Sequence, residues 1–175
     1  MLRMVRHAPR FHHKRQLLPP LGKGKRLYPL YETNAGGCGL NPANMVVELT
    51  ESYLVKESSS VRSIFGDIRD LGLKIAMDDF GTSYSSLGIL KTSPADIVKI
   101  DKTCIKDIKN SYFDAAFIRF VVELCHDVQI RVCLEGVKTQ GEYQIVSAMP
   151  LDFIQGYLFG CPVPAEEFLY RYFSV

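Results

Sequence analysis

Residues 74–87 read Lys-Ile-Ala-Met-Asp-Asp-Phe-Gly-Thr-Ser-Tyr-Ser-Ser-Leu, a short apolar run that ends in two adjacent carboxylates and continues into small polar residues. Adjacent carboxylates repel each other, so a divalent cation would stabilise Asp78 beside Asp79, and such hard oxygen ligands suit Mg²⁺, Mn²⁺ or Ca²⁺. A turn that caps a helix would use the same residues without a metal. The pair therefore has two interpretations, a cation site and a structural turn.

The same pattern, a short apolar run that ends in a polar side chain, recurs along the chain. It occurs in five segments: 45–48, 75–79, 97–101, 131–135 and 151–155. Between them, apolar residues recur at the spacing of a helix. Examples are Val61, Ile64, Phe65, Ile68 and Leu71, and also Phe113, Phe117, Phe120, Val121 and Leu124. Repeated strand–helix units predict a parallel sheet covered by helices, either a closed barrel or an open doubly wound sheet.

Polar residues lie at the ends of these predicted strands, where both architectures place functional sites. They are Glu48, Asp78, Asp79, Lys99, Glu135 and Gln155. Because the carboxyl ends of parallel strands meet at one end of the sheet, the sequence predicts that these side chains share one site.

Five ordered motifs resemble those of the EAL domain, a bacterial cyclic di-GMP phosphodiesterase domain. They are Val-Glu-Leu-Thr-Glu-Ser at 47–52, Met-Asp-Asp-Phe-Gly-Thr-Ser-Tyr-Ser-Ser-Leu at 77–87, Asp-Ile-Val-Lys-Ile-Asp at 96–101, Leu-Glu-Gly-Val-Lys-Thr at 134–139 and Gln-Gly-Tyr-Leu-Phe-Gly-Cys-Pro-Val-Pro at 155–164. The resemblance implies an α/β fold, namely a partial TIM-like (β/α)8 barrel that lacks its first strands and has a mostly parallel sheet flanked by helices. Residues 38–175 would form this part of the barrel.

The resemblance also implies hydrolysis of cyclic di-GMP to the linear dinucleotide with two Mg²⁺ or Mn²⁺ ions. A two-metal clamp suits an anionic phosphodiester because it offsets charge and supplies the nucleophile together. By correspondence of motifs, Glu48, Asp78 and Asp79 would bind the ions, with Asp78 bridging them.

Four further residues receive roles from the same resemblance. Lys99 would orient or help to activate the attacking water, and Glu135 would act as a base or as a ligand of the second metal. Gln155 would hold the nucleotide or its water network, and Glu51 would brace the loop after Asp79.

These residues also have simpler structural interpretations. Lys99 could extend from a strand end and pair with Asp101. Glu48 and Glu51 could form an exposed pair in a turn, and Gln155 could belong only to a turn. The Asp-Phe-Gly sequence also occurs in protein kinases, but the chain has neither a glycine-rich loop before a strand lysine nor a His-Arg-Asp segment, which excludes that class.

Departures from the family pattern limit the expected activity. The chain has no Glu-Ala-Leu motif, and none of Asn34, Asn41 and Asn44 follows an apolar strand in the manner of the family's metal-binding asparagine. Lys138 stands where the family usually has an acid, and a positive charge beside a metal site is expected to weaken metal binding. We therefore expect weak or no turnover from this chain alone. The alternative is a degenerate domain that binds a nucleotide or a protein partner without turnover.

Residues 1–31 contain eight Lys or Arg and no acid, whereas the whole chain has a formal net charge of only +2. This basic segment lacks the interleaved aromatic residues and amphipathic spacing of nucleic-acid or membrane binding, and the apolar core of a signal peptide. We expect it to be a disordered or non-native leader, as a truncated or shifted reading frame would produce. No run is long and apolar enough to predict a transmembrane helix.

The cysteines are odd in number and scattered, which indicates reduced, structurally buried thiols and a cytoplasmic protein. They are Cys38, Cys104, Cys125, Cys133 and Cys161. An incompletely closed barrel would leave exposed strand edges, so we expect a homodimer or pairing with another chain.

Residues 165–173 follow Pro162 and Pro164 and predict a last helix. Its larger apolar residues are expected to face the barrel. They are Phe168, Leu169, Tyr172 and Phe173.

Overall fold

The computed structural model describes residues 41–50, 59–82 and 87–173. These residues form one parallel sheet in which strands follow one another in chain order, from β1 to β5. The strands are β1 (Val46–Thr50), β2 (Lys74–Phe80), β3 (Ile97–Ile100), β4 (Arg131–Leu134) and β5 (Phe153–Ile154). The prediction of an α/β fold with a parallel sheet at these five segments is confirmed. The predictions for residues 1–31, Cys38 and Glu51 lie outside the described residues.

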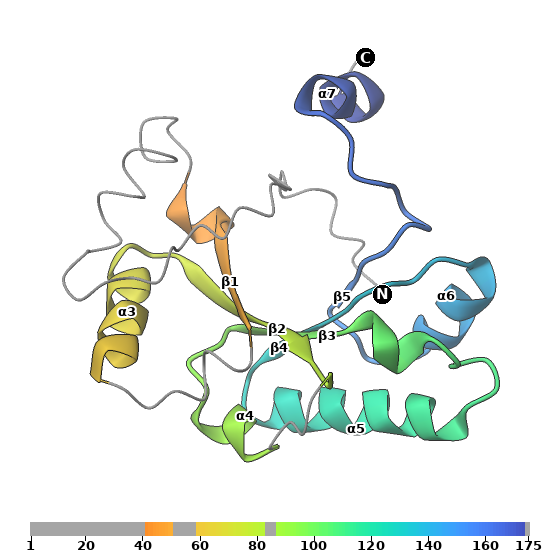
Figure 1. Cartoon of the computed structure of the whole chain (residues 1–175), viewed down its shortest axis with the longest axis horizontal. Helices are drawn as coiled ribbons and strands as arrows, with labels where there is room; N and C mark the ends of the chain where they lie inside the picture. The colour runs from red at the N-terminus through yellow and green to blue at the C-terminus, as the bar shows by residue number, and fades with distance from the viewer. Residues whose placement is uncertain (1–40, 51–58, 83–86, 174–175) are drawn as a thin grey trace.

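Helices connect the strands and cover one face of the sheet (Figure 1). They are α3 (Ser59–Asp70), α4 (Gly88–Thr92), α5 (Tyr112–Asp127) and α6 (Gln140–Val146), together with the short 3₁₀ helix η3 (Lys102–Ile105). The 3₁₀ helix η2 (Pro42–Asn44) precedes β1, and helix α7 (Ala165–Phe173) follows β5. Side chains of successive sheet residues point to opposite faces, so every second residue of a strand faces these helices.

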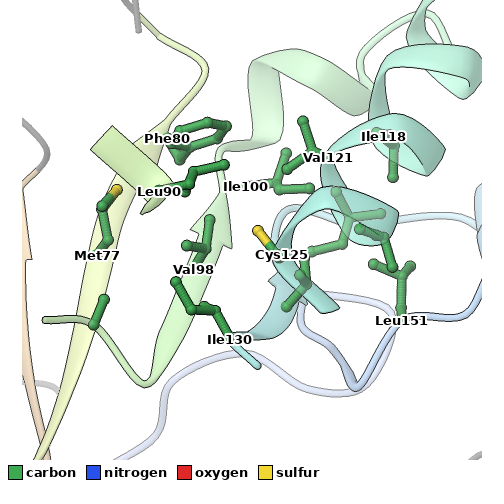
Figure 2. Close-up of a cluster of buried hydrophobic side chains, with 14 of the residues drawn as sticks. Met77, Phe80, Leu90, Val98, Ile100, Ile118, Val121, Cys125, Ile130 and Leu151 are labelled. Atoms are coloured by element: carbon green, nitrogen blue, oxygen red, sulfur yellow. The ribbon is translucent and has the colours of Figure 1, made fainter. Parts of the chain in front are cut away.

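The main core lies between the sheet and the helices (Figure 2). Met77 and Phe80 of β2 and Val98 and Ile100 of β3 are fully buried there. They pack with apolar residues of α4, α5 and the neighbouring loops. These are Leu90, Ile118, Val121, Cys125, Ile130 and Leu151. Burial of each large apolar side chain stabilises the fold by about 1.5–3 kcal/mol, so this cluster holds β2 and β3 firmly in place.

Helix α5 faces the core with only some of its apolar residues. Ile118, Val121, Val122 and Cys125 are buried. Phe113 and Phe120, which share the helical spacing noted in the sequence, are instead 76% and 49% exposed. The helix has apolar residues around most of its circumference, and hydrophobic spacing alone does not distinguish its two apolar faces.

The opposite face of the sheet carries a smaller apolar cluster. Ala76, Ile97 and Cys133 are buried there, with Phe153 packed against them. The guanidinium carbon of Arg131 lies 5.2 Å from the centre of the Phe153 ring, which is the geometry of a cation–π contact. This cluster supports the same sheet face that presents the polar residues described below.

Two aspartates fix the strands at their amino ends. The Ile75 amide donates to Asp96 Oδ2 at 2.8 Å, and the Val132 amide donates to Asp152 Oδ2 at 2.8 Å. Asp152 Oδ2 also lies 2.9 Å from Nε2 of His126, at the end of α5. Each aspartate precedes one strand and binds the neighbouring strand, so the register is fixed at the end of the sheet away from the polar cluster.

Helix α7 forms at the predicted residues, but its predicted packing is partly wrong. Tyr172 and Phe173 are 43% and 58% exposed, and Figure 1 shows α7 apart from the sheet. Cys161, before this helix, is also exposed, contrary to the expectation that all cysteines are buried. Among the described residues, no helix is both long and apolar enough to cross a bilayer.

Candidate active site

Lys99 lies at the centre of the polar cluster. Strand β3 is buried along its whole length, and Lys99 is only 6% exposed. Because Val98 and Ile100 face the helices, Lys99 projects from the other face. Its Nζ lies 2.8 Å from Glu48 Oε1, 2.9 Å from Asp78 Oδ1 and 2.8 Å from Glu135 Oε1. One ammonium group therefore binds three carboxylates.

The three carboxylates come from three different strand segments. Glu48 is the third residue of β1, Asp78 lies near the end of β2, and Glu135 follows β4 directly. The Glu135 amide donates to the Ile100 carbonyl at 3.0 Å, which extends the pairing of β3 and β4 by one residue. The parallel register thus brings Lys99 and these three predicted site residues together.

A β-bulge places Asp78 and Asp79. Met77 pairs with Val98 but Phe80 pairs with Ile100, so β2 contains one extra residue between these positions. Asp79 takes up this residue with a φ of 59°, in the left-handed region that aspartate tolerates better than most residues. As a result Phe80 returns to the core, Asp78 remains beside Lys99, and Asp79 is exposed.

The surroundings of Lys99 fix its charge. Burial alone would lower the pKa of Lys99, but the hydrogen bonds and negative charges of Glu135 and Glu48 outweigh burial and raise that pKa above its usual range. Lys99 is therefore a cation and a hydrogen-bond donor at neutral pH. Its alternative predicted partner, Asp101, instead accepts a 2.8 Å hydrogen bond from the Thr103 amide at the start of η3.

Two glycines hold the loops that carry Glu135 and Gln155. Gly136 has a φ of +84°, and a Cβ there would overlap Cβ of Lys102. A Cβ on Gly156 would overlap the Val137 carbonyl oxygen. The Val137 amide donates to the Gln155 carbonyl at 3.1 Å in this close approach. The sequence predicted at most a turn at Gly156 and no role for Gly136, although each glycine directly follows a candidate site residue.

The side-chain amide oxygen of Gln155 is a hydrogen-bond acceptor that no described group satisfies. Its side-chain Oε1 is buried and has no hydrogen-bond partner within the described part of the chain. A buried amide oxygen without a partner costs free energy, so this atom is suited to accept a bond from a ligand or a water.

The donor chemistry fits a hard divalent cation. Glu48 and Asp78 present carboxylate oxygens beside Lys99, and such hard oxygen donors are the ligands that a divalent cation of this kind prefers. In the described ranges, no group of three or more His, Cys, Asp or Glu is arranged around a metal position, and the three carboxylates each contact Lys99 Nζ. The three carboxylates outnumber the ammonium, so the cluster is net negative and attracts a cation.

Lys138, the predicted charge reversal, lies on the loop between β4 and α6. Its side chain is exposed, and its amide donates to Glu142 Oε2 at 2.7 Å. Glu142 also accepts from the Thr139 amide at 2.9 Å, which completes a capping box at the start of α6. The Lys138 amide hydrogen bond is the main cause that lowers the pKa of Glu142, against the opposing effect of burial. The backbone of residue 138 therefore starts a helix.

Residues 36–162 match the family model of the EAL domain. The chain belongs to the EAL domain family. The matched range includes every candidate site residue of the polar cluster, and also Glu51.

Curated relatives of this EAL domain include much longer proteins. An uncharacterized protein of Sinorhizobium fredii, y4lL, is 36% identical over 151 residues, which are 86% of this chain and 18% of that protein. The bifunctional diguanylate cyclase/cyclic di-GMP phosphodiesterase MucR of Pseudomonas aeruginosa is 34% identical over 130 residues, or 74% of this chain and 19% of MucR. The chain thus spans about a fifth of the length of these relatives.

Solved structures of EAL proteins have the same fold. A complex of the PaMucR phosphodiesterase with cyclic di-GMP has a TM-score of 0.74 and 31% identity, and the match covers 84% of this chain and 60% of that one. Klebsiella pneumoniae BlrP1 with manganese and cyclic di-GMP has a TM-score of 0.72 and 31% identity, over 77% of this chain and 34% of BlrP1. A calcium complex of BlrP1 has a TM-score of 0.65 and 33% identity, over 70% of this chain and 31% of that one.

Proposed function

We propose that this EAL domain hydrolyses one phosphodiester bond of cyclic di-GMP, with Mg²⁺ or Mn²⁺ as cofactor and with weak turnover in this chain alone. The observation that carries the proposal is the convergence of Glu48, Asp78 and Glu135 on the buried Lys99. The relatives and neighbouring structures named above support the substrate and the divalent metals.

In this proposal Glu48, Asp78 and Asp79 hold the metal ions. When bound, such ions offset the negative charge of the phosphate and activate water. Glu51, which precedes α3, would brace the loop that follows Asp79.

The charge of each remaining residue determines whether it donates or accepts a hydrogen bond or a proton in the reaction. Lys99 is held in its protonated form by Glu135 and Glu48, so it acts as a donor that orients the attacking water or a phosphate oxygen, and it does not act as a base. Glu135 is an anionic acceptor at the same place and takes the proton of the water. The free amide oxygen of Gln155 binds the nucleotide or its water network.

Chromatographic analysis of cyclic di-GMP incubated with the purified chain and Mn²⁺ or Mg²⁺ tests this proposal. We expect linear dinucleotide from the unaltered chain and at least a hundredfold less from Glu135→Ala, the typical effect of removing a general base. Glu166→Ala, at an exposed carboxylate of α7, is the matched control and should leave the rate unchanged. Equal rates for the unaltered chain and Glu135→Ala would reject the assignment.

A second candidate function is binding without turnover. It is favoured by the Lys99 ammonium, which occupies the point where the carboxylates converge. Calorimetric titration with cyclic di-GMP distinguishes the two candidates. Binding without a linear product supports a nucleotide-binding module, whereas neither binding nor product excludes both.

We also propose that the chain forms a homodimer through the outer face of α5. A hollow of about 290 Å³ there is lined by an apolar and charged set of residues. They are Tyr112, Ala115, Ala116, Arg119, Phe120 and Glu123. Arg119 and Glu123 lie one helical turn apart, so two antiparallel copies could pair each arginine with the other copy's glutamate. A monomer mass in light scattering at micromolar concentration would reject this proposal.

A cytoplasmic location is the compartment we propose for this chain. Cys104, Cys125 and Cys161 are free thiols in the structure, as expected in a reducing compartment. Cell fractionation tests the location, and recovery of the chain outside the cytoplasmic fraction would reject it.

A further inference from the structure

The structure assigns Lys99 a second role, as an internal cation that competes with the divalent metal for the oxygens of Glu48 and Asp78. The inference rests on the proposed function because it takes these residues as metal ligands. It goes further in stating that the metal binds only when the ammonium group releases them, so that metal binding and Lys99 release are coupled.

The first argument is the number of bonds that Lys99 makes. An ammonium group has three N–H donors, and the structure gives each of them one carboxylate acceptor. Glu48 Oε1 and Asp78 Oδ1 are each within 2.9 Å of Nζ. Two of the proposed metal ligands are therefore already bound to a positive charge.

The second argument is electrostatic. Lys99 is 6% exposed, so water screens its charge poorly. A divalent ion bound to the same two oxygens would lie within a few ångströms of Nζ, where repulsion between like charges is strong. The shared oxygens can stabilise either the ammonium or the divalent ion well. Binding both at once costs a large repulsive free energy.

The third argument is that a lysine can move away without disrupting the strand. Its charge is carried on four flexible methylene groups, whereas the backbone of β3 is held on both sides by β2 and β4. After exchange, Glu135 is the one partner of Lys99 outside the shared pair, and Nζ regains free donors. These donors can then bind a phosphate oxygen of the substrate.

The test compares Lys99→Met, Lys99→Arg and the unaltered chain, after chelation and during titration with Mn²⁺ in a calorimeter. Lys109→Met, an exposed lysine after η3, is the matched control. We expect Lys99→Met to bind Mn²⁺ roughly tenfold more tightly than the unaltered chain, within the usual range of coupling between two sites. Lys99→Arg keeps the charge, and Lys109→Met removes one elsewhere, so both should keep the original affinity within a factor of about two.

Thermal melting gives a second readout that does not depend on turnover. In chelator, Lys99→Met leaves three carboxylates without their cation, and its Tm should fall by about 10 °C or more. Saturating Mn²⁺ should raise the Tm of Lys99→Met more than that of the unaltered chain, because a tighter ligand stabilises more. If Lys99→Met folds only with Mn²⁺, the chelator concentration that unfolds it measures how tightly this variant holds Mn²⁺.

Equal or weaker Mn²⁺ binding by Lys99→Met overturns the inference, as does tight binding by Lys99→Arg. Absence of Mn²⁺ binding to every variant overturns both the inference and the metal dependence of the proposed function. The expected order of affinities without hydrolysis of cyclic di-GMP rejects only the enzymatic proposal and leaves the competition established.

Discussion

The environment of a buried ionisable side chain determines its charge, and therefore its chemistry. Lys99 stays charged because three carboxylates surround it. Cys125 stays uncharged because burial disfavours the thiolate. Burial, and secondarily the negative charge of Asp152, raises the pKa of the Cys125 thiol to about 11. A raised thiol pKa means that the reactive thiolate is scarce at every pH well below 11.

This contrast predicts the order of thiol alkylation. At pH 8, iodoacetamide should label the exposed Cys161 at least ten times faster than Cys125, which is buried and protonated. Peptide mapping by mass spectrometry measures both rates in one sample. The difference should disappear in denaturant, and equal labelling of the two residues in the folded chain would contradict the burial of Cys125.

At the scale of the elements, the loop after β5 depends on a residue without a side chain. Gly156 lies against the Val137 backbone, and the carbonyl of Val137 also accepts a 3.1 Å hydrogen bond from the Leu158 amide. Gly156→Ala should therefore destabilise the fold by about 2 kcal/mol or more, since backbone atoms must move. Urea unfolding measures this change.

Gly66 provides a matched control for this substitution. It lies exposed inside α3, and a Cβ there would meet no atom within 4 Å. Gly66→Ala should stabilise the chain by about 0.8–1 kcal/mol through helix propensity. If both variants destabilise equally, the close approach at Gly156 is not the cause.

The strands could be predicted from the sequence because each combines a β-branched run with a following polar residue. The bulge at Asp78–Asp79 could not, because it depends on how β2 pairs with β3 and not on β2 alone. The burial of α5 could not be assigned for a related reason. Its apolar residues surround the helix, and only the packed sheet selects Ile118 and Val121 over Phe120.

For the site, the sequence predicted that the polar strand ends would meet, and Glu48, Asp78 and Glu135 do meet at Lys99. It did not predict that one lysine would bind all three, because spacing along the chain gives no distances between side chains. The roles of these residues, and those of Asp79, Gln155 and Glu51, remain predictions.

At the scale of the whole molecule, the outer face of α5 determines the proposed association state. Phe120→Glu places a charge among exposed apolar residues and should weaken a dimer about thirtyfold or more, the effect of losing a central contact. Tyr170→Glu, at an exposed aromatic residue of α7, should leave the mass unchanged. Sedimentation at several concentrations measures both, and a monomer mass for the unaltered chain at every concentration would exclude the dimer.

The order of the strands bears on how the chain acquires this structure. Each strand pairs with the strand that precedes it in sequence, from Val46 against Lys74 to Cys133 against Phe153. Within the described sheet, no strand has to wait for a segment beyond the next strand, and the entropy of loop closure grows only slowly with loop length. The sheet can therefore grow strand by strand as the chain leaves the ribosome, with each new helix covering the strands already in place.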